Sequence, residues 1–177
     1  MKLVILDRDG TINYDSDQYI KSPAEWKPIP GSLQAIARLN QAGWRITVAT
    51  NQSGIARGLF DMAALNAIHA EMHRAVGLAG GRIDAIFFCP HAADSGCECR
   101  KPRPGLLREI ASRMDVGLAE VPMVGDSLRD LEAAAAAGAK PYLVLTGKGK
   151  KTRDAGGLPQ GTQVFADLGA VAARLAP

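Results

Sequence analysis

The sequence predicts an α/β protein built on a mainly parallel, doubly wound sheet. Short apolar runs typical of strands alternate along the chain with segments of helical periodicity. Parallel strands need crossover connections, and the intervening helices supply them. The 177 residues, 47% of them hydrophobic, are enough for a full core, so we expect one domain over residues 1–177.

The first predicted strand, at residues 3–6, leads directly into an acidic motif. Its four apolar residues indicate a strand buried on both faces, and Asp7-Arg8-Asp9-Gly10-Thr11 follows at once. Residues two apart on an extended chain point to the same side, so Asp7 and Asp9 should face one crevice while Arg8 points elsewhere. In open α/β sheets ligands bind in that crevice, although a polar strand end with a glycine turn would also explain this motif alone.

A polar loop with several prolines is expected over residues 12–30, directly after this strand. Long loops in such a position are more often functional than idle. A helix at residues 31–42, which Gly43 ends, and a strand at residues 45–49, which leads into Thr50, come next. Asp61 is the predicted N-cap of a helix that runs to about Val76.

The second half of the chain continues the alternation. Further strands are expected at residues 85–88, 121–124, 141–145 and 163–165. Further helices are expected at residues 104–114, 127–137 and 167–175, the second of them ended by Gly138. Residues 146–161, rich in glycine and lysine, are predicted to form a loop.

Composition argues against several classes of protein. The net charge of +3 is small and dispersed, so it gives no support for nucleic-acid binding. No apolar run approaches the roughly 20 residues of a membrane span, and the N-terminus lacks a signal-peptide pattern. The three cysteines, all between residues 89 and 99, make no disulfide framework. We therefore expect a cytoplasmic monomer that binds neither membrane nor nucleic acid.

Polar side chains recur where the predicted strands end. Asp7 and Asp9 follow the first strand, Thr50 follows the second, and Asp126 follows the strand at residues 121–124. Because the carboxyl ends of parallel strands meet at one edge of a sheet, these groups should share one site. The three carboxylates offer the oxygen ligands that Mg²⁺ prefers, and Thr50 with the cation of Lys101 offers contacts for phosphate oxygens.

Four ordered motifs resemble those of the haloacid dehalogenase superfamily of phosphohydrolases. They are Asp7-Arg8-Asp9-Gly10-Thr11, Thr50 at a strand end, Lys101, and Gly125-Asp126-x-x-x-Asp130. Each motif alone is weak, but together they span nearly the whole chain in the order of that superfamily. The resemblance implies a Rossmann-like core. The length of this chain agrees with that of relatives that lack a large cap domain.

The resemblance also implies roles for individual residues. Asp7 would be the nucleophile that forms an aspartyl-phosphate, and Asp9 would protonate the leaving alkoxide and then deprotonate the attacking water. Thr50 and Lys101 would hold the transferring phosphoryl oxygens.

Mg²⁺ is the cofactor that the resemblance implies for this chemistry. The ion would sit on Asp7, the backbone carbonyl of Asp9, and Asp126. Asp130 would not touch the metal itself but would orient Lys101 or a metal-bound water.

A second group of residues predicts a structural Zn²⁺ site. Cys89-Pro90-His91 and Cys97-Glu98-Cys99 bring three thiolates and one imidazole together in two close pairs, which fits a closed tetrahedral site. The alternative is three buried free thiols with a surface histidine. With no position open for substrate, zinc here would stiffen the loop that ends at Arg100 and Lys101.

The sequence of the same loop resembles one particular family within this superfamily. The pattern Cys-Pro-His…Cys-x-Cys-Arg-Lys-Pro, together with residues 50–58, is similar to the phosphatase family of bacterial heptose biosynthesis. Those enzymes act on the 7-phosphate of D-glycero-D-manno-heptose 1,7-bisphosphate in the lipopolysaccharide and nucleotide-heptose precursor pathway. The implied partner is a small anionic phosphosugar. The implied substrate-binding residues are Asp15, Ser16, Asp17, Gln18, Tyr19, Asn51, Gln52, Ser53 and Arg100.

Other interpretations stay open at this stage. Histidinol-phosphate phosphatase domains share the zinc loop but usually have Asp where Ser53 stands. Some relatives have Lys where this chain has Ser127, which leaves the anomer preference open. A zinc-stabilised nucleic-acid-binding module is the alternative from another class, but three clustered carboxylates would repel phosphate without a metal.

Two further motifs are set aside. The segment from His69 to His73 resembles a zincin helix, but its glutamate is misplaced, so solvated helix residues are expected there. Residues 146–152 lack the spacing of a phosphate-binding loop, so their lysines, Lys148 among them, should be solvated and act on an anionic substrate from a distance.

Overall fold

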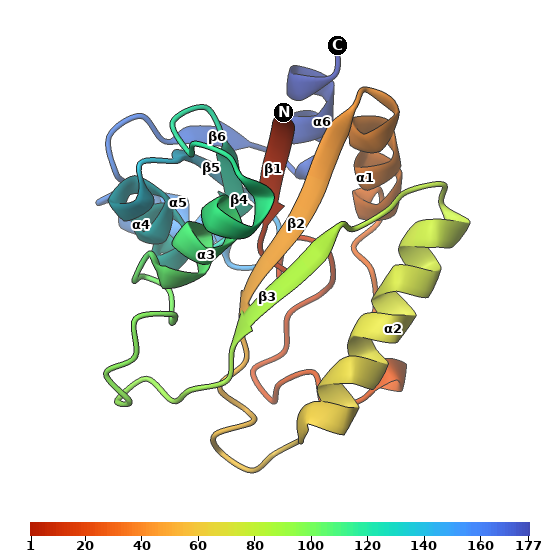
Figure 1. The fold of residues 1–177 in the computed structure, drawn as a ribbon, viewed down its shortest axis with the longest axis vertical. Coiled ribbons are helices and arrows are strands. Elements are labelled where there is room, and N and C mark those ends of the chain that lie inside the picture. The colour runs from red at the N-terminus through yellow and green to blue at the C-terminus, as the bar shows by residue number, and fades with distance from the viewer.

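The computed structural model describes all 177 residues, and its sheet has six strands in the order β3-β2-β1-β4-β5-β6, all parallel (Figure 1). The strands are β1 Lys2–Leu6, β2 Trp44–Asn51, β3 Ala85–Cys89, β4 Pro122–Gly125, β5 Lys140–Val144 and β6 Gln163–Phe165. The strand order reverses on the two sides of β1, which lies between β2 and β4. Such a switch point is where an α/β sheet opens a crevice.

Helices cover both faces of the sheet, as a doubly wound fold requires (Figure 1). They are α1 Ser32–Gln41, α2 Met62–Leu78, α3 Gly105–Met114, α4 Leu128–Ala137, α5 Gly149–Ala155 and α6 Leu168–Leu175, with a short 3₁₀ helix, η1 Pro23–Glu25. Alternate residues of β1 separate the two cores: Val4 and Leu6 pack with α1, α2 and α6, whereas Leu3 and Ile5 pack with α3 and α4. The predicted fold class is confirmed.

Local signals place most of the element ends where the sequence predicts them. The side chain of Asp61 accepts a hydrogen bond of 2.9 Å from the backbone N–H of Ala64, so it caps α2 as predicted. Gly138 takes a left-handed conformation with φ of 75° and ends α4.

The predicted loop over residues 146–161 is wrong in part, because α5 forms at Gly149–Ala155. The helix has only seven residues and lies between glycines, so tertiary contacts must stabilise it. The hydroxyl of Thr152 donates to the backbone carbonyl of Asp126 at 2.8 Å, and Gly149 packs so closely on the Val144 carbonyl that a side chain would collide. These contacts join residues far apart in the chain, which local pattern cannot reveal.

The carboxyl ends of the strands lie together, at the end of the molecule opposite the two chain termini (Figure 1). Leu6 at the end of β1 is in register with Val48 on one side and Val124 on the other. The backbone N–H of Asp7 donates to the Val124 carbonyl at 2.8 Å, which holds Asp7 beside the start of the Gly125-Asp126 segment. No helix has both the length and the apolar character that a membrane crossing needs.

Candidate active site

A polar cavity of about 240 Å³ opens at the carboxyl ends of the strands. The residues predicted for catalysis, metal or substrate that line it are Asp7, Asp9, Asp15, Ser16, Asp17, Tyr19, Asn51, Gln52, Ser53, Arg100, Lys101, Asp126 and Asp130. Two predicted residues do not line it. Thr50 is buried behind Gln52, whose amide donates to its hydroxyl at 2.9 Å, and Gln18 is an exposed residue of the neighbouring loop. A direct contact from Gln18 to substrate therefore has no support in this geometry.

Three buried carboxylates gather at the floor of the cavity. Asp7, Asp126 and Asp130 each present an oxygen, and these oxygens lie within 4.8 Å of one another. Asp7 extends from the end of β1, and the other two come from the end of β4 and the first turn of α4. Lys101, itself only 2% exposed, donates from Nζ to Asp7 at 2.8 Å and to Asp130 at 2.7 Å. One ammonium therefore faces three carboxylates.

The electrostatics of this group fit a divalent cation. Burial, followed by repulsion from Asp130, raises the pKa of Asp7 well above its usual range and that of Asp126 to about 7. Burial works to lower the pKa of Lys101, but Asp130 and Asp7 outweigh it and raise that pKa, so the ammonium stays charged. A hard cation with oxygen ligands would remove the remaining repulsion.

Asp130 serves two partners at once. Its Oδ1 accepts from Lys101, while its Oδ2 accepts from the backbone N–H of Ser127 at 3.1 Å and from the Ser127 hydroxyl at 2.8 Å. Ser127 and Asp130 thus form a capping box at the start of α4. The helix end fixes the carboxylate that holds Lys101.

Asp126 is held by the segment before α5. The backbone N–H of Lys148 donates to its Oδ2 at 2.7 Å. Gly10 and Gly147, both with positive φ, approach so closely that a Cβ on either would collide with the Asp126 carboxylate. Their missing side chains let three separate loops meet at this residue.

The Asp9 carboxylate lies outside the cluster of three and has its own partners. Its Oδ1 accepts from Arg8 and from the Asn13 amide at 2.9 Å, and its Oδ2 accepts from the Gln52 amide at 3.1 Å. Burial works to raise the pKa of Asp9, but the Arg8 charge and these hydrogen bonds prevail and lower it. The two carboxylates of the Asp7-Arg8-Asp9 motif both line the cavity, yet their environments shift their pKa values in opposite directions.

The contact between Arg8 and His69 shows that the predicted solvation of His69 is wrong. Arg8 points away from the cavity, as expected, but its guanidinium is buried, and its Nη1 lies 3.2 Å from Nε2 of His69. His69 was predicted to be solvated, yet it is only 8% exposed, whereas His73 is exposed. His69 belongs to the apolar stripe of α2 with Leu65 and Met72, and this helical spacing was the signal that could have placed it inside.

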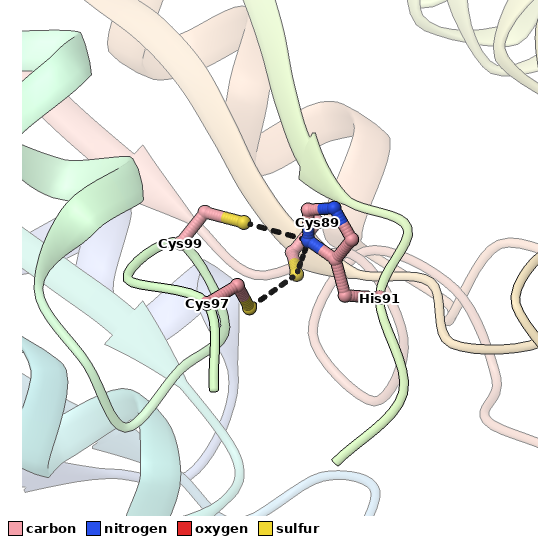
Figure 2. Close-up of side chains that lie close together, drawn as sticks. All are labelled: Cys89, His91, Cys97 and Cys99. Carbon is pink, nitrogen blue, oxygen red and sulfur yellow. Dashed lines mark hydrogen bonds between the residues drawn. The ribbon is translucent and has the colours of Figure 1, made fainter. Parts of the chain in front are cut away.

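The predicted zinc ligands come together in one cluster (Figure 2). Nδ1 of His91 lies 3.4 Å from the sulfur of Cys89 and 3.2 Å from that of Cys99, and the Cys89 and Cys97 sulfurs are 3.7 Å apart. Although His91 is exposed, its ring faces the sulfurs, which argues against three unrelated thiols and a surface histidine.

The thiols of this cluster differ in their pKa values. Hydrogen bonding, first of all to Ser95, lowers the pKa of Cys97 to about 6, while burial raises that of Cys89 and, with the neighbouring thiols, raises that of Cys99 to about 12. Three soft thiols with an inward imidazole nitrogen match the donor set of a closed Zn²⁺ site. A metal would have to displace the protons of the less acidic thiols.

The cluster connects directly to the cavity. Arg100 and Lys101 follow Cys99, and the Asn51 side chain binds the Lys101 backbone twice, donating to its carbonyl and accepting from its N–H, each at 3.0 Å. The Asn51 side chain therefore holds the backbone at Lys101, directly after the cysteine loop.

Three cations at the cavity are not among the residues that the sequence predicts for binding. Arg57, Arg129 and Lys148 line the wall together with Arg100. Lys148, predicted to be solvated and to act from a distance, pairs with Asp15 at 3.2 Å. Arg129 carries no motif signal, although its place in the first turn of α4, close after Asp126, could have indicated that it reaches the same crevice.

Comparison with known proteins agrees with this site. The family model described as HAD-hydrolase-like matches residues 98–171. The D-glycero-beta-D-manno-heptose-1,7-bisphosphate 7-phosphatase of Bordetella bronchiseptica is 66% identical over 175 residues, covering 99% of this chain and 98% of the relative. The protein of the same name from Pseudomonas putida is 57% identical and covers 99% of both chains.

The chain belongs to the heptose bisphosphate phosphatase family. These matches confirm the predicted resemblance to the haloacid dehalogenase superfamily. A solved structure of this family, the D,D-heptose 1,7-bisphosphate phosphatase from B. bronchiseptica complexed with magnesium and phosphate, has a TM-score of 0.97. That structure is 66% identical and covers 99% of this chain and 98% of its own. The B. bronchiseptica protein thus resembles this chain in both sequence and fold over nearly its whole length.

Proposed function

We propose that this protein is a Mg²⁺-dependent phosphatase that hydrolyses the 7-phosphate of D-glycero-D-manno-heptose 1,7-bisphosphate through an aspartyl-phosphate. The observation that carries the proposal is the cluster of Asp7, Asp126 and Asp130 around Lys101, on the floor of a cavity walled by cations. Relatives at 66% and 57% identity that are named for this reaction support the choice of substrate.

Each residue has a task in the proposed reaction. A carboxylate oxygen of Asp7 attacks phosphorus, the bond to the sugar oxygen breaks, and that oxygen takes a proton from Asp9. Asp9 then takes a proton from water, which attacks the aspartyl-phosphate, releases phosphate and restores the Asp7 carboxylate. Lys101, whose three hydrogens already have partners, acts on the phosphoryl oxygens through its charge. The Thr50 hydroxyl would contact them only after the Gln52 amide that covers it had turned away.

Asp7, Asp126 and the backbone carbonyl of Asp9 would hold Mg²⁺, as proposed from the sequence. When bound there, the ion supplies positive charge to the transferring phosphoryl group. A relative whose crystal structure contains magnesium and phosphate supports this assignment. Asp130 would keep Lys101 in place, for which its 2.7 Å hydrogen bond to Nζ is well suited.

The wall of the cavity suits a substrate with two phosphates. Arg57, Arg100, Arg129 and Lys148 surround it, and the Nη1 atom of Arg100 is buried without a hydrogen-bond partner. Asp15, Ser16, Asp17, Asn51 and Ser53 would contact the sugar hydroxyls. A polar cavity of this size suits a small phosphosugar better than a nucleic acid.

We propose Zn²⁺ as a structural ion held by Cys89, His91, Cys97 and Cys99, supported by the inward geometry of their ligand atoms. The single domain over residues 1–177, the monomeric state and the cytoplasmic location stay predictions.

Phosphate release from heptose 1,7-bisphosphate and from histidinol phosphate, assayed side by side with Mg²⁺, tests the proposed function. The sugar should be the strongly preferred substrate. The reverse preference would assign the chain to histidinol phosphate instead, and no release from either would refute the phosphatase proposal.

A further inference from the structure

A buried arginine–histidine pair lies behind Asp9 and has no place in the reaction described above. The Arg8 guanidinium, only 1% exposed, donates to Asp9 Oδ1 through Nε at 3.2 Å and through Nη2 at 3.0 Å. Its remaining nitrogen, Nη1, lies 3.2 Å from Nε2 of His69. The three residues form a chain from the interior of α2 to the cavity.

The chemistry of arginine determines the state of His69. A guanidinium can only donate, so Nε2 of His69 must accept and the ring proton must sit on Nδ1. A protonated ring would place two cations in contact inside the core. Consistent with this, burial and the neighbouring Arg8 charge lower the pKa of His69 to about 3. His69 is thus a neutral acceptor that uses the one guanidinium nitrogen not engaged by Asp9.

The two oxygens of Asp9 are unequal as a result. Oδ1 accepts three hydrogen bonds, two from Arg8 and one from Asn13 at 2.9 Å. Oδ2 accepts one, from Gln52 at 3.1 Å, and the same amide also donates to the Thr50 hydroxyl at 2.9 Å. Proton binding on Oδ1 would disrupt three contacts. On Oδ2 it requires only that the Gln52 amide turn over, so that its oxygen accepts from Asp9 and from the Thr50 hydroxyl.

We propose that His69 and Arg8 are positioning residues that make Oδ2 the atom of Asp9 that carries the transferred proton. His69 acts through Arg8: it anchors the guanidinium, which occupies Oδ1 and leaves Oδ2 on the side of Gln52 and Thr50. The inference rests on the proposed function, in which Asp9 is the acid and base. It adds the orientation of that group and a residue of α2 that contacts no substrate.

The first experiment compares leaving groups in the Mg²⁺-loaded protein. His69→Leu removes the acceptor, and His69→Gln keeps a neutral one. A sugar alkoxide needs the proton from Asp9, whereas the nitrophenolate of p-nitrophenyl phosphate leaves without it. His69→Leu should therefore lower kcat/KM for heptose 1,7-bisphosphate by about 10- to 100-fold, with kcat falling more than KM changes. It should alter kcat/KM for the aryl phosphate, which reports only the steps up to nitrophenolate release and not the later attack of water, by less than about threefold. His69→Gln should recover most of the loss.

His73→Leu is the matched control, because His73 lies one turn further along α2 and is exposed. It should leave both substrates unaffected. Equal losses of kcat/KM on both substrates in His69→Leu would indicate general damage to the fold and overturn the proposal, as would no loss on either.

The second experiment needs no substrate and no variant. Nitrogen NMR of ¹⁵N-histidine-labelled protein should show His69 protonated on Nδ1, unprotonated on Nε2, and neutral down to pH 5. A protonated Nε2 or a charged ring would overturn the proposal even in an active enzyme. If the unmodified protein released no phosphate from the sugar, the proposed function would fail by itself, and the NMR result would still decide whether Arg8 and His69 are arranged as inferred.

Discussion

Lys101 illustrates how a single side chain organises this site. Its ammonium donates to Asp7, to Asp130 and, at 2.7 Å, to the Ala49 carbonyl, so all three of its hydrogens have partners. The cost of burying one cation is offset by two carboxylates, which in turn repel each other and Asp126. The residues needed for chemistry therefore oppose stability at this point.

The substitution Asp7→Asn separates the catalytic role of Asp7 from its effect on stability. An amide cannot act as the nucleophile, so phosphate release should fall by about 10³-fold or more. Because burial raises the pKa of Asp7, its ionised form is unfavourable in the folded protein, and the neutral variant should melt at the same temperature or higher in metal-free buffer at pH 7. Thermal unfolding with and without Mg²⁺ measures this. Normal turnover would rule out the covalent step.

His69 should leave a signature in the pH dependence of stability. Its pKa is about 3 in the folded protein and 6.5 when unperturbed, so between these values the unfolded chain binds a proton that the native ring does not. Stability from this residue is therefore complete above about pH 6.5 and falls by up to about 1.4 kcal/mol per unit as the pH drops toward 3. Urea unfolding at pH 7, 6 and 5 should show a shallower decline in His69→Gln. An identical decline in both proteins would contradict the assignment.

At the scale of elements, local signals identified most strands and helices because their causes are local. Asp61 and Gly138 mark the helix ends that their side-chain chemistry predicts. The prediction of a loop at α5 is wrong because contacts to Asp126 and Val144 stabilise a helix in a Gly- and Lys-rich segment. The catalytic motifs were predictable because strand ends converge by topology. Arg129 was not predicted, and Lys148 was placed too far from the substrate, because their approach to the cavity depends on how α4 and the segment before α5 pack.

The segment before α5 offers a test of that packing. Gly147→Ala introduces a Cβ that meets Asp126 and Gly10 at a residue with φ of 53°, so it should displace Asp126, weaken Mg²⁺ binding and lower activity. Gly157→Ala is the matched control, since φ there is 71° but no atom lies within 4 Å. Both should lose about 1 kcal/mol from backbone strain, measured by urea unfolding, and only the first should lose metal affinity by titration calorimetry. Equal affinity in both variants would contradict the close approach.

The cysteine loop should behave as a metal-dependent element. Cys97→Ser removes one of four ligands, so zinc content by metal analysis should fall, and each kcal/mol lost should lower Tm by roughly 2–4 °C in a chain of this size. Because Arg100 and Lys101 follow the loop, kcat should fall as well. Purified protein without zinc would contradict the structural-ion proposal. Asp94→Ser, an exposed change in the same loop outside the thiol cluster, is the control.

At the scale of the whole molecule, the fold brings positive charges together at one place, which the composition does not reveal. The net charge is only +3, yet Arg57 after β2, Arg100 after the cysteines, Arg129 in α4 and Lys148 before α5 all meet at one cavity. The acidic floor and the basic wall suit a metal ion and an anionic substrate, respectively. Global composition therefore could not predict the binding site, whereas the order of strand ends could.

Arg129 tests whether this basic wall selects a second phosphate. Arg129→Gln removes one charge from an exposed side chain of the wall, so KM for heptose 1,7-bisphosphate should rise by about 10-fold, equivalent to about 1.4 kcal/mol of lost binding, with little change in kcat. The KM of a sugar monophosphate, which has no second phosphate, should change by less than about twofold. Arg174→Gln, an exposed change in α6 outside the cavity, should affect neither substrate. If the KM values of both substrates rose equally, Arg129 would be acting through the general field at the site, and selection of the second phosphate would have to come from Arg57, Arg100 or Lys148.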